Sequence, residues 1–151
     1  DQLKDLFKAY NDSQKGEFKR ITAERKLYLA NSSYVGSESC KTCHADQFKK
    51  WESSNHSKAY TTLVKKNKSE DWECVSCHVV GSKEKGGFVS ISDSPHLANV
   101  QCENCHGPRR SHLTNPKNSQ HVDAKKVCSS CHHLPHSSDF NFKKYWAKIK
   151  H

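Results

Sequence analysis

The chain has 151 residues, of which only 33% are hydrophobic and 27% are charged, and its formal charge is +9. This length predicts one domain. The composition excludes folding around a large apolar core of the chain's own, because a small domain buries little apolar surface. No stretch is long or apolar enough to span a membrane. The positive charge by itself would suit a nucleic acid or an anionic surface.

Residues 1–33 contain no cysteine or histidine and have the pattern of a helix. Apolar residues recur at helical spacing over residues 3–10 and again over residues 18–29. The polar residues 11–13 and Gly16 lie between these runs and predict a break or a cap. We expect either an amphipathic helix that packs on the rest of the chain, or a linker or oligomerisation helix.

Four copies of the pentapeptide Cys-x-x-Cys-His follow, and they contain all eight cysteines of the chain. They begin at Cys40, Cys74, Cys102 and Cys128. Successive first cysteines are therefore 34, 28 and 26 residues apart (74 − 40, 102 − 74 and 128 − 102). These unequal intervals exclude a simple tandem repeat of one module.

The segments between and after the motifs alternate between helical and irregular patterns. Apolar residues at helical spacing predict a helix over residues 48–63. Residues 81–87 form a charged loop that contains glycine, and residues 88–91 alternate, which predicts a short strand or an extended segment. The polar residues 107–121 predict a loop. The apolar spacing over 142–151 predicts a last amphipathic helix.

The pentapeptide is the sequence that attaches haem c. Its two thiols add across the porphyrin vinyl groups, and its histidine becomes the proximal iron ligand. Disulfides or zinc sites are the alternatives, but neither requires a histidine after the second cysteine of every pair. We therefore predict four covalent haem c groups, each containing iron. The predicted attachment residues are Cys40, Cys43, Cys74, Cys77, Cys102, Cys105, Cys128 and Cys131, and the predicted proximal ligands are His44, His78, His106 and His132.

Each iron also needs a second axial ligand, unless it stays open for chemistry. The chain has no methionine, which excludes the histidine–methionine pair of high-potential cytochromes. Seven histidines lie outside the motifs, more than the four that are needed. We select His56, His96, His112 and His151 as the second ligands. His121, His136 or a histidine of a neighbouring subunit are the alternatives, and His133 is disfavoured because it adjoins a proximal ligand.

These observations predict a mainly α fold with extensive loops, a small multihaem cytochrome c fold organised around four covalently bound haems over residues 34–151. Haem c is attached outside the bacterial cytoplasm, so we expect a periplasmic or extracellular protein. No export signal is visible at Asp1, so it was removed or the chain is a fragment. The haem propionates offset part of the charge, which argues against nucleic acid and favours redox partner proteins with acidic surfaces.

The sequence resembles the cytochrome c-554 family of tetrahaem proteins. The residues that carry the resemblance are Tyr34 to Cys40, Asn55 to Ala59, Cys77 to Val79, Gly81, Gly86, Gly87 and Cys102 to Pro108. The cytochrome domains fused behind metallophosphoesterase-like domains are the most similar, through residues 95–100 and 140–151. By this resemblance residues 1–33 would be a connector and the chain a fragment.

The resemblance implies haems in stacked parallel pairs joined by near-perpendicular contacts. It assigns His112 to the first haem, His56 to the third and His151 to the fourth. The second haem of the family's best-known member is five-coordinate. His96 stands here where that member lacks a histidine, so we expect a six-coordinate second haem.

Three functions agree with these features. The first is an electron-transfer protein that carries single electrons through closely packed bis-histidine haems. The second is a haem enzyme in which one open iron acts on a small nitrogen oxide or a peroxide. The third is a filament subunit, in which self-association lines up the haems of successive copies.

Overall fold

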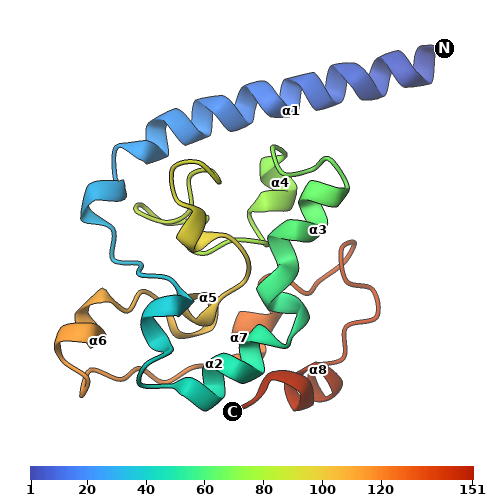
Figure 1. The fold of residues 1–151 in the computed structure, drawn as a ribbon. Helices are drawn as coiled ribbons and strands as arrows, with labels where there is room; N and C mark the ends of the chain where they lie inside the picture. The colour runs from blue at the N-terminus through green and yellow to red at the C-terminus, as the bar shows by residue number, and fades with distance from the viewer.

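A single long helix, α1 (Gln2–Lys26), lies along one edge of the molecule (Figure 1). The computed structural model describes all 151 residues, Asp1 to His151. The rest of the chain forms short helices joined by loops, with no β-strand and one isolated β-bridge between Val79 and Ala98. The predicted mainly α fold with extensive loops is therefore confirmed.

The elements after α1 are short α-helices and 3₁₀ turns, too short to be stable without tertiary contacts. In chain order they are η1 (Leu29–Asn31), η2 (Ser37–Cys40), α2 (Ala45–Glu52), η3 (Asn55–Lys58), α3 (Ala59–Lys65), α4 (Trp72–Val75), η4 (Pro95–Leu97), α5 (Cys102–His106), α6 (Arg110–Thr114), α7 (Ala124–Ser129) and α8 (Phe142–Ile149). None of the helices has the length and apolar character needed to cross a membrane.

Three of the expected elements differ from the observed ones, and a fourth is as expected. α1 continues through residues 11–16 without the predicted break, since an exposed glycine costs a helix only about 1 kcal/mol. The helix expected over 48–63 is divided at Ser53 and Ser54, whose hydroxyls donate to helix carbonyls. The expected loop 107–121 contains α6. The predicted last helix is confirmed as α8.

Residues 88–91 form no strand, and the backbone of Phe88 and Val89 is extended or irregular. The N–H of Phe88 donates to the carbonyl of Val80 at 2.8 Å. The N–H of Val80 donates in turn to Leu97 at 2.9 Å. These isolated bonds join three irregular segments, so the strand alternative is wrong.

The apolar core is small and surrounds the second motif. It consists of Phe18, Tyr34, Tyr60, Leu63, Val75, Val79, Val80, Phe88, Leu97 and Ala98. No residue after Glu103 is buried. The last third of the chain therefore folds without a core made of its own side chains.

α1 is anchored to the segment that precedes the second motif. Phe18 is buried against Trp72, with ring centroids 5.8 Å apart. The guanidinium of Arg25 lies over the same indole, 5.1 Å from its centroid, and donates to the carbonyls of Phe88, Gly81 and Glu84. These contacts favour the interpretation of α1 as a helix packed on the rest of the chain.

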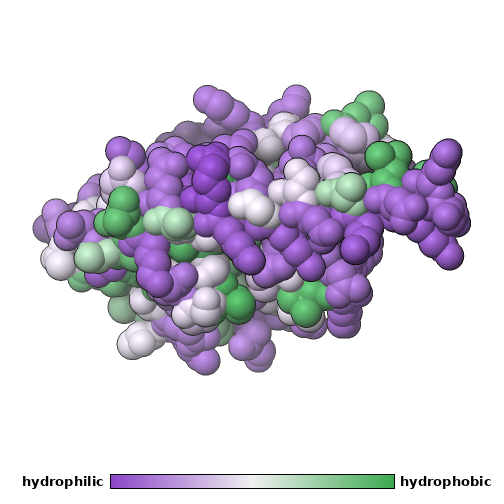
Figure 2. All heavy atoms as spheres, turned by 90° about the horizontal axis from the view of Figure 1, so that it is seen from above, coloured by the Kyte–Doolittle hydropathy of each residue, from purple (hydrophilic) through white to green (hydrophobic).

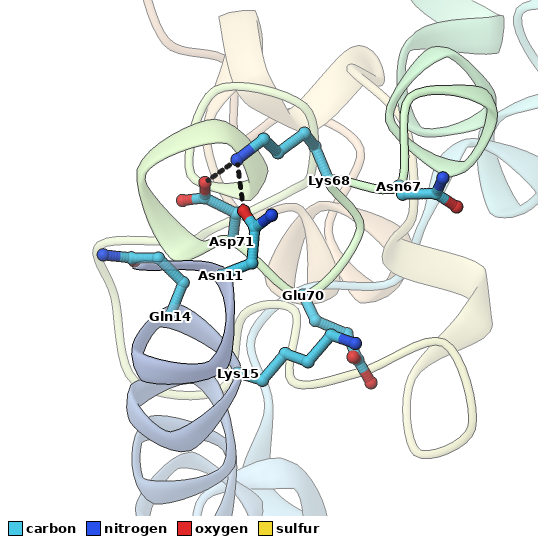
Figure 3. Close-up of a pocket in the computed structure, with 7 residues that line it drawn as sticks. All are labelled: Asn11, Gln14, Lys15, Asn67, Lys68, Glu70 and Asp71. Atoms are coloured by element: carbon cyan, nitrogen blue, oxygen red, sulfur yellow. Dashed lines mark hydrogen bonds and ion pairs between the residues drawn. The ribbon is translucent and has the colours of Figure 1, made fainter. Parts of the chain in front are cut away.

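A polar contact joins the middle of α1 to the loop before α4 (Figure 3). The ammonium of Lys68 donates to the side-chain oxygen of Asn11 at 3.2 Å and pairs with Asp71 at 3.1 Å. The carboxylate of Asp71 also accepts from the N–H of Glu73 and so caps α4. The loop is thus linked both to α1 and to the helix that carries Cys74.

The N-terminal end of α1 projects beyond the body of the molecule (Figure 1). Its side chains Leu3, Leu6 and Phe7 are 60%, 67% and 60% exposed. Figure 2 shows hydrophobic side chains gathered beside the hydrophilic tip of this end. The helix is therefore packed on the body from its middle to its C-terminal end and uncovered over its first turns.

Candidate haem sites

Each motif lies on a helical turn, which brings its reactive side chains to one side. The first begins at the end of η2, the second within α4, the third is α5 and the fourth begins in α7. In the first and fourth motifs the histidine N–H donates to the carbonyl of the first cysteine, at 2.9 Å in both. Residues i, i+3 and i+4 of a helical turn share a face. Two thiols and one imidazole can therefore meet the edge and the centre of one macrocycle.

Three motif histidines each face a histidine from elsewhere in the chain. The ring centroids of His44 and His112 are 6.2 Å apart. Those of His56 and His132 are 6.1 Å apart, and those of His106 and His151 are 5.8 Å apart. Each pair joins one predicted proximal ligand to one predicted second ligand.

These separations have the size that an iron between the rings requires. Two imidazoles that bind one metal ion from opposite sides, with metal–nitrogen bonds of about 2.0 Å, have centroids roughly 6.3 Å apart. Aromatic rings in direct contact span about 4.5 to 7 Å, as His132 and Phe140 at 4.9 Å and Phe142 and Trp146 at 6.0 Å show, so the indication of a shared metal is that histidine meets histidine in all three pairs. The donor set at these three motifs therefore fits a bis-histidine haem.

Hydrogen bonds at Nδ1 orient several of the rings. The Nδ1 atom lies 2.7 Å from the Ala59 carbonyl in His78, 2.9 Å from the Asn118 carbonyl in His112, and 3.0 Å from the Ile149 carbonyl in His151. A carbonyl only accepts, so Nδ1 carries the proton in each case. Nε2 then has a free lone pair, the form in which imidazole binds a metal.

Burial favours the neutral form of the facing rings as well. It lowers the pKa of His56, and nearby His132 lowers it further. Burial likewise lowers the pKa of His106 and of His132. A neutral imidazole is the state that ligates iron, so the local environment supports the proposed role.

The histidine contacts differ in part from the assignment that the family resemblance implies. His112 faces His44 of the first motif, in agreement with it. His56 faces His132 of the fourth motif, not the third, and His151 faces His106 of the third, not the fourth. α5 and α7 are in contact, so the third and fourth motifs lie close together in space.

The second motif lacks such a facing ring. No histidine ring stacks opposite His78, and His96 is exposed. The segment that carries His96 nevertheless adjoins the motif, because Val79 forms a β-bridge with Ala98 and Val80 bonds Leu97. His96 therefore lies near the second motif, but its ring does not face His78.

Contacts between thiols show which motifs are neighbours. The hydrogen bond from Cys40 lowers the pKa of Cys102 to about 6, and the pKa of Cys40 is raised by the same contact. The hydrogen bond from Cys131 lowers the pKa of Cys77 to about 5. The pKa of Cys105 is raised to about 11 by burial and then by the charge of Cys128.

The motifs therefore touch in the order first, third, fourth, second. The first and third are joined through Cys40 and Cys102, the third and fourth through the contact between α5 and α7, and the fourth and second through Cys131 and Cys77. This spatial order differs from the order along the chain.

All eight cysteines are free thiols in the structure. No three histidine, cysteine or acidic side chains converge as a metal site. A structural zinc site needs four such ligands, so the side chains are not arranged as zinc knuckles.

Glu103 is a positioning residue that its sequence pattern did not reveal. It stands between the two cysteines of the third motif and is only 2% exposed. Its carboxylate accepts from the N–H groups of Val35, Gly36 and Arg109 at 2.8 to 3.1 Å. It thus fixes the segment before the first motif and the loop after the third. The only signal in the sequence was an acidic residue inside a haem motif.

Comparison with known proteins agrees with this geometry. Residues 39–107 match the family model described as cytochrome c554 and c-prime. The matched residues contain the first three motifs, whereas the fourth lies beyond them. Cytochrome c-554 of Nitrosomonas europaea is 36% identical over 106 residues, 60% of this chain and 45% of that protein. The chain thus spans less than half the length of this relative. No solved structure matches it significantly.

Proposed function

We propose that this chain is an electron-transfer protein that holds haem c at each of its four motifs. The observation that carries the proposal is the set of three histidine pairs, whose ring separations of 5.8 to 6.2 Å fit axial ligands of one iron. When bound, haem c supplies one-electron redox chemistry at low reduction potential if both ligands are histidine. The likeness to cytochrome c-554 supports the same role.

The chain's own residues would serve this role by position. Side chains of the four motifs contact one another in the order first, third, fourth, second, so we infer that electrons pass between sites in that order. The paired histidines keep both axial positions closed, which prevents small molecules from binding. Partner proteins with acidic surfaces, a periplasmic or extracellular location, and a fusion to a metallophosphoesterase-like domain remain predictions. The division into an N-terminal segment, residues 1–33, and a tetrahaem domain, residues 34–151, is also a prediction.

The mass of the protein, produced in a host that attaches haem c, tests the proposal. We expect the polypeptide mass plus four haems. Replacing both cysteines of one motif by serine should remove one haem at a time. A bare polypeptide from a competent host would refute haem attachment.

The second motif supports one alternative, a haem enzyme with an open iron. His78 has no facing histidine, so the second site would be five-coordinate unless His96 turns inward to bind. Electron paramagnetic resonance of the oxidised protein separates the two arrangements. A high-spin ferric signal at neutral pH would indicate an open second site. If His96 is the ligand, that signal is absent and appears in His96→Ala.

A further inference from the structure

His133 and His136 form a histidine pair that faces none of the motif histidines. Their ring centroids are 6.2 Å apart with an angle of 75° between the ring planes. This separation equals that of His44 and His112, at which two imidazoles can reach a single metal ion. Both side chains are exposed, so an ion can reach them directly from solvent.

The backbone holds both rings on one turn. The N–H groups of His136 and Ser137 both donate to the carbonyl of His133, at 3.0 Å each. Nδ1 of His133 lies 2.9 Å from the carbonyl oxygen of Leu134, so Nδ1 carries the proton and Nε2 has a free lone pair. The ring of His136 has no hydrogen bond that would compete with a metal.

We propose that His133 and His136 bind a divalent late transition metal ion, foremost Cu(II). Imidazole nitrogen suits copper, nickel and zinc, and Cu(II) binds most tightly in this series. No third histidine, cysteine or acidic side chain converges on the pair, so water completes the coordination. Two imidazoles with open positions fit the tetragonal geometry of Cu(II) better than the closed tetrahedral site of structural zinc.

Titration of the oxidised holoprotein with Cu(II), followed by calorimetry and electron paramagnetic resonance, tests this site. We expect one Cu(II) ion to bind tightly to each protein molecule, with an electron paramagnetic resonance signal that shows nitrogen ligands. His133→Ala and His136→Ala should each lower the affinity at least about tenfold, because each leaves a single imidazole. His121→Ala is the matched control, an exposed histidine of a loop, and should bind as the unchanged protein does.

The haem absorption spectrum and mass of each variant show whether its haem sites are intact, which separates loss of copper from loss of the fold. The absence of such tight Cu(II) binding in the unchanged protein would overturn the proposal. So would an unchanged affinity in either pair variant, or an equal loss of affinity in His121→Ala.

Discussion

Glu103 combines a buried charge with three backbone donors, and this makes it sensitive to substitution. Glu103→Ala would leave the N–H groups of Val35, Gly36 and Arg109 without their acceptor, at a cost of about 3 kcal/mol in unfolding free energy. Glu103→Gln keeps one acceptor oxygen and should cost less. Denaturant unfolding followed by circular dichroism measures both. Glu38→Ala, at an exposed position in η2, is the control and should change stability by less than about 0.5 kcal/mol.

The contact between His56 and His132 predicts that His56 serves the fourth site. His56→Ala should therefore create a high-spin ferric signal, because one axial position is lost. A second variant identifies the site: His56→Ala combined with Cys128→Ser and Cys131→Ser, which removes the fourth haem. The signal should then disappear. If it persists in the combined variant, His56 ligates another iron.

For single residues, the Cys-x-x-Cys-His motifs predicted the attachment cysteines and the proximal histidines, because haem attachment requires a contiguous sequence pattern. The partner of each motif histidine could not be predicted in the same way. His56 precedes three of the motifs, and the motif that it faces is set by tertiary packing, which the sequence does not show. The role of Glu103 was also hidden, because its importance comes from backbone groups that are distant in sequence.

At the scale of elements, α1 and the loop after the second motif use glycine in opposite ways. Gly16 lies inside α1 with no atom within 4 Å of an added Cβ. Gly16→Ala should therefore stabilise α1 by about 1 kcal/mol. At Gly87 an added Cβ would meet the backbone of Gly81, so Gly87→Ala should strongly destabilise the protein. Thermal unfolding of the two variants compares them, and a loss of stability in Gly16→Ala would contradict the predicted continuous helix.

Helices with a regular apolar spacing were predicted best, as in α8, whose pattern from Phe142 to Ile149 is uninterrupted. The errors arose where local polar residues act through tertiary context. Ser53 and Ser54 end α2 by bonding its carbonyls, whereas Gly16 does not end α1. Residue type alone does not separate these cases, because serine and glycine occur both inside helices and at their ends.

For the whole molecule, the burial pattern predicts a fold that depends on haem unevenly. The chain's own core lies around the second motif, and no residue after Glu103 is buried. A haem-free chain, made without attachment, should therefore lose protection first over residues 104–151. Limited proteolysis with mass analysis of the fragments, compared with the holoprotein, measures this. Equal protection of 104–151 in both forms would contradict the prediction.

Haem c as the cofactor could be predicted from the sequence, and so could a fold with little core of its own. The spatial order of the sites could not be predicted, because the length of a loop does not show in which direction it leads the chain. The unequal intervals between motifs excluded a simple repeat. In the structure the first motif lies beside the third, and the second lies beside the fourth.

The closeness of Cys40 to Cys102 and of Cys77 to Cys131 has a consequence for how the protein matures. Each of these pairs joins thiols of two different motifs, and one member of each is acidic enough to be a thiolate near neutral pH. An oxidant that met the folded chain before attachment would couple them as disulfides and block two sites at once. Attachment of haem to reduced cysteines, before an oxidant meets the folded chain, would avoid this coupling.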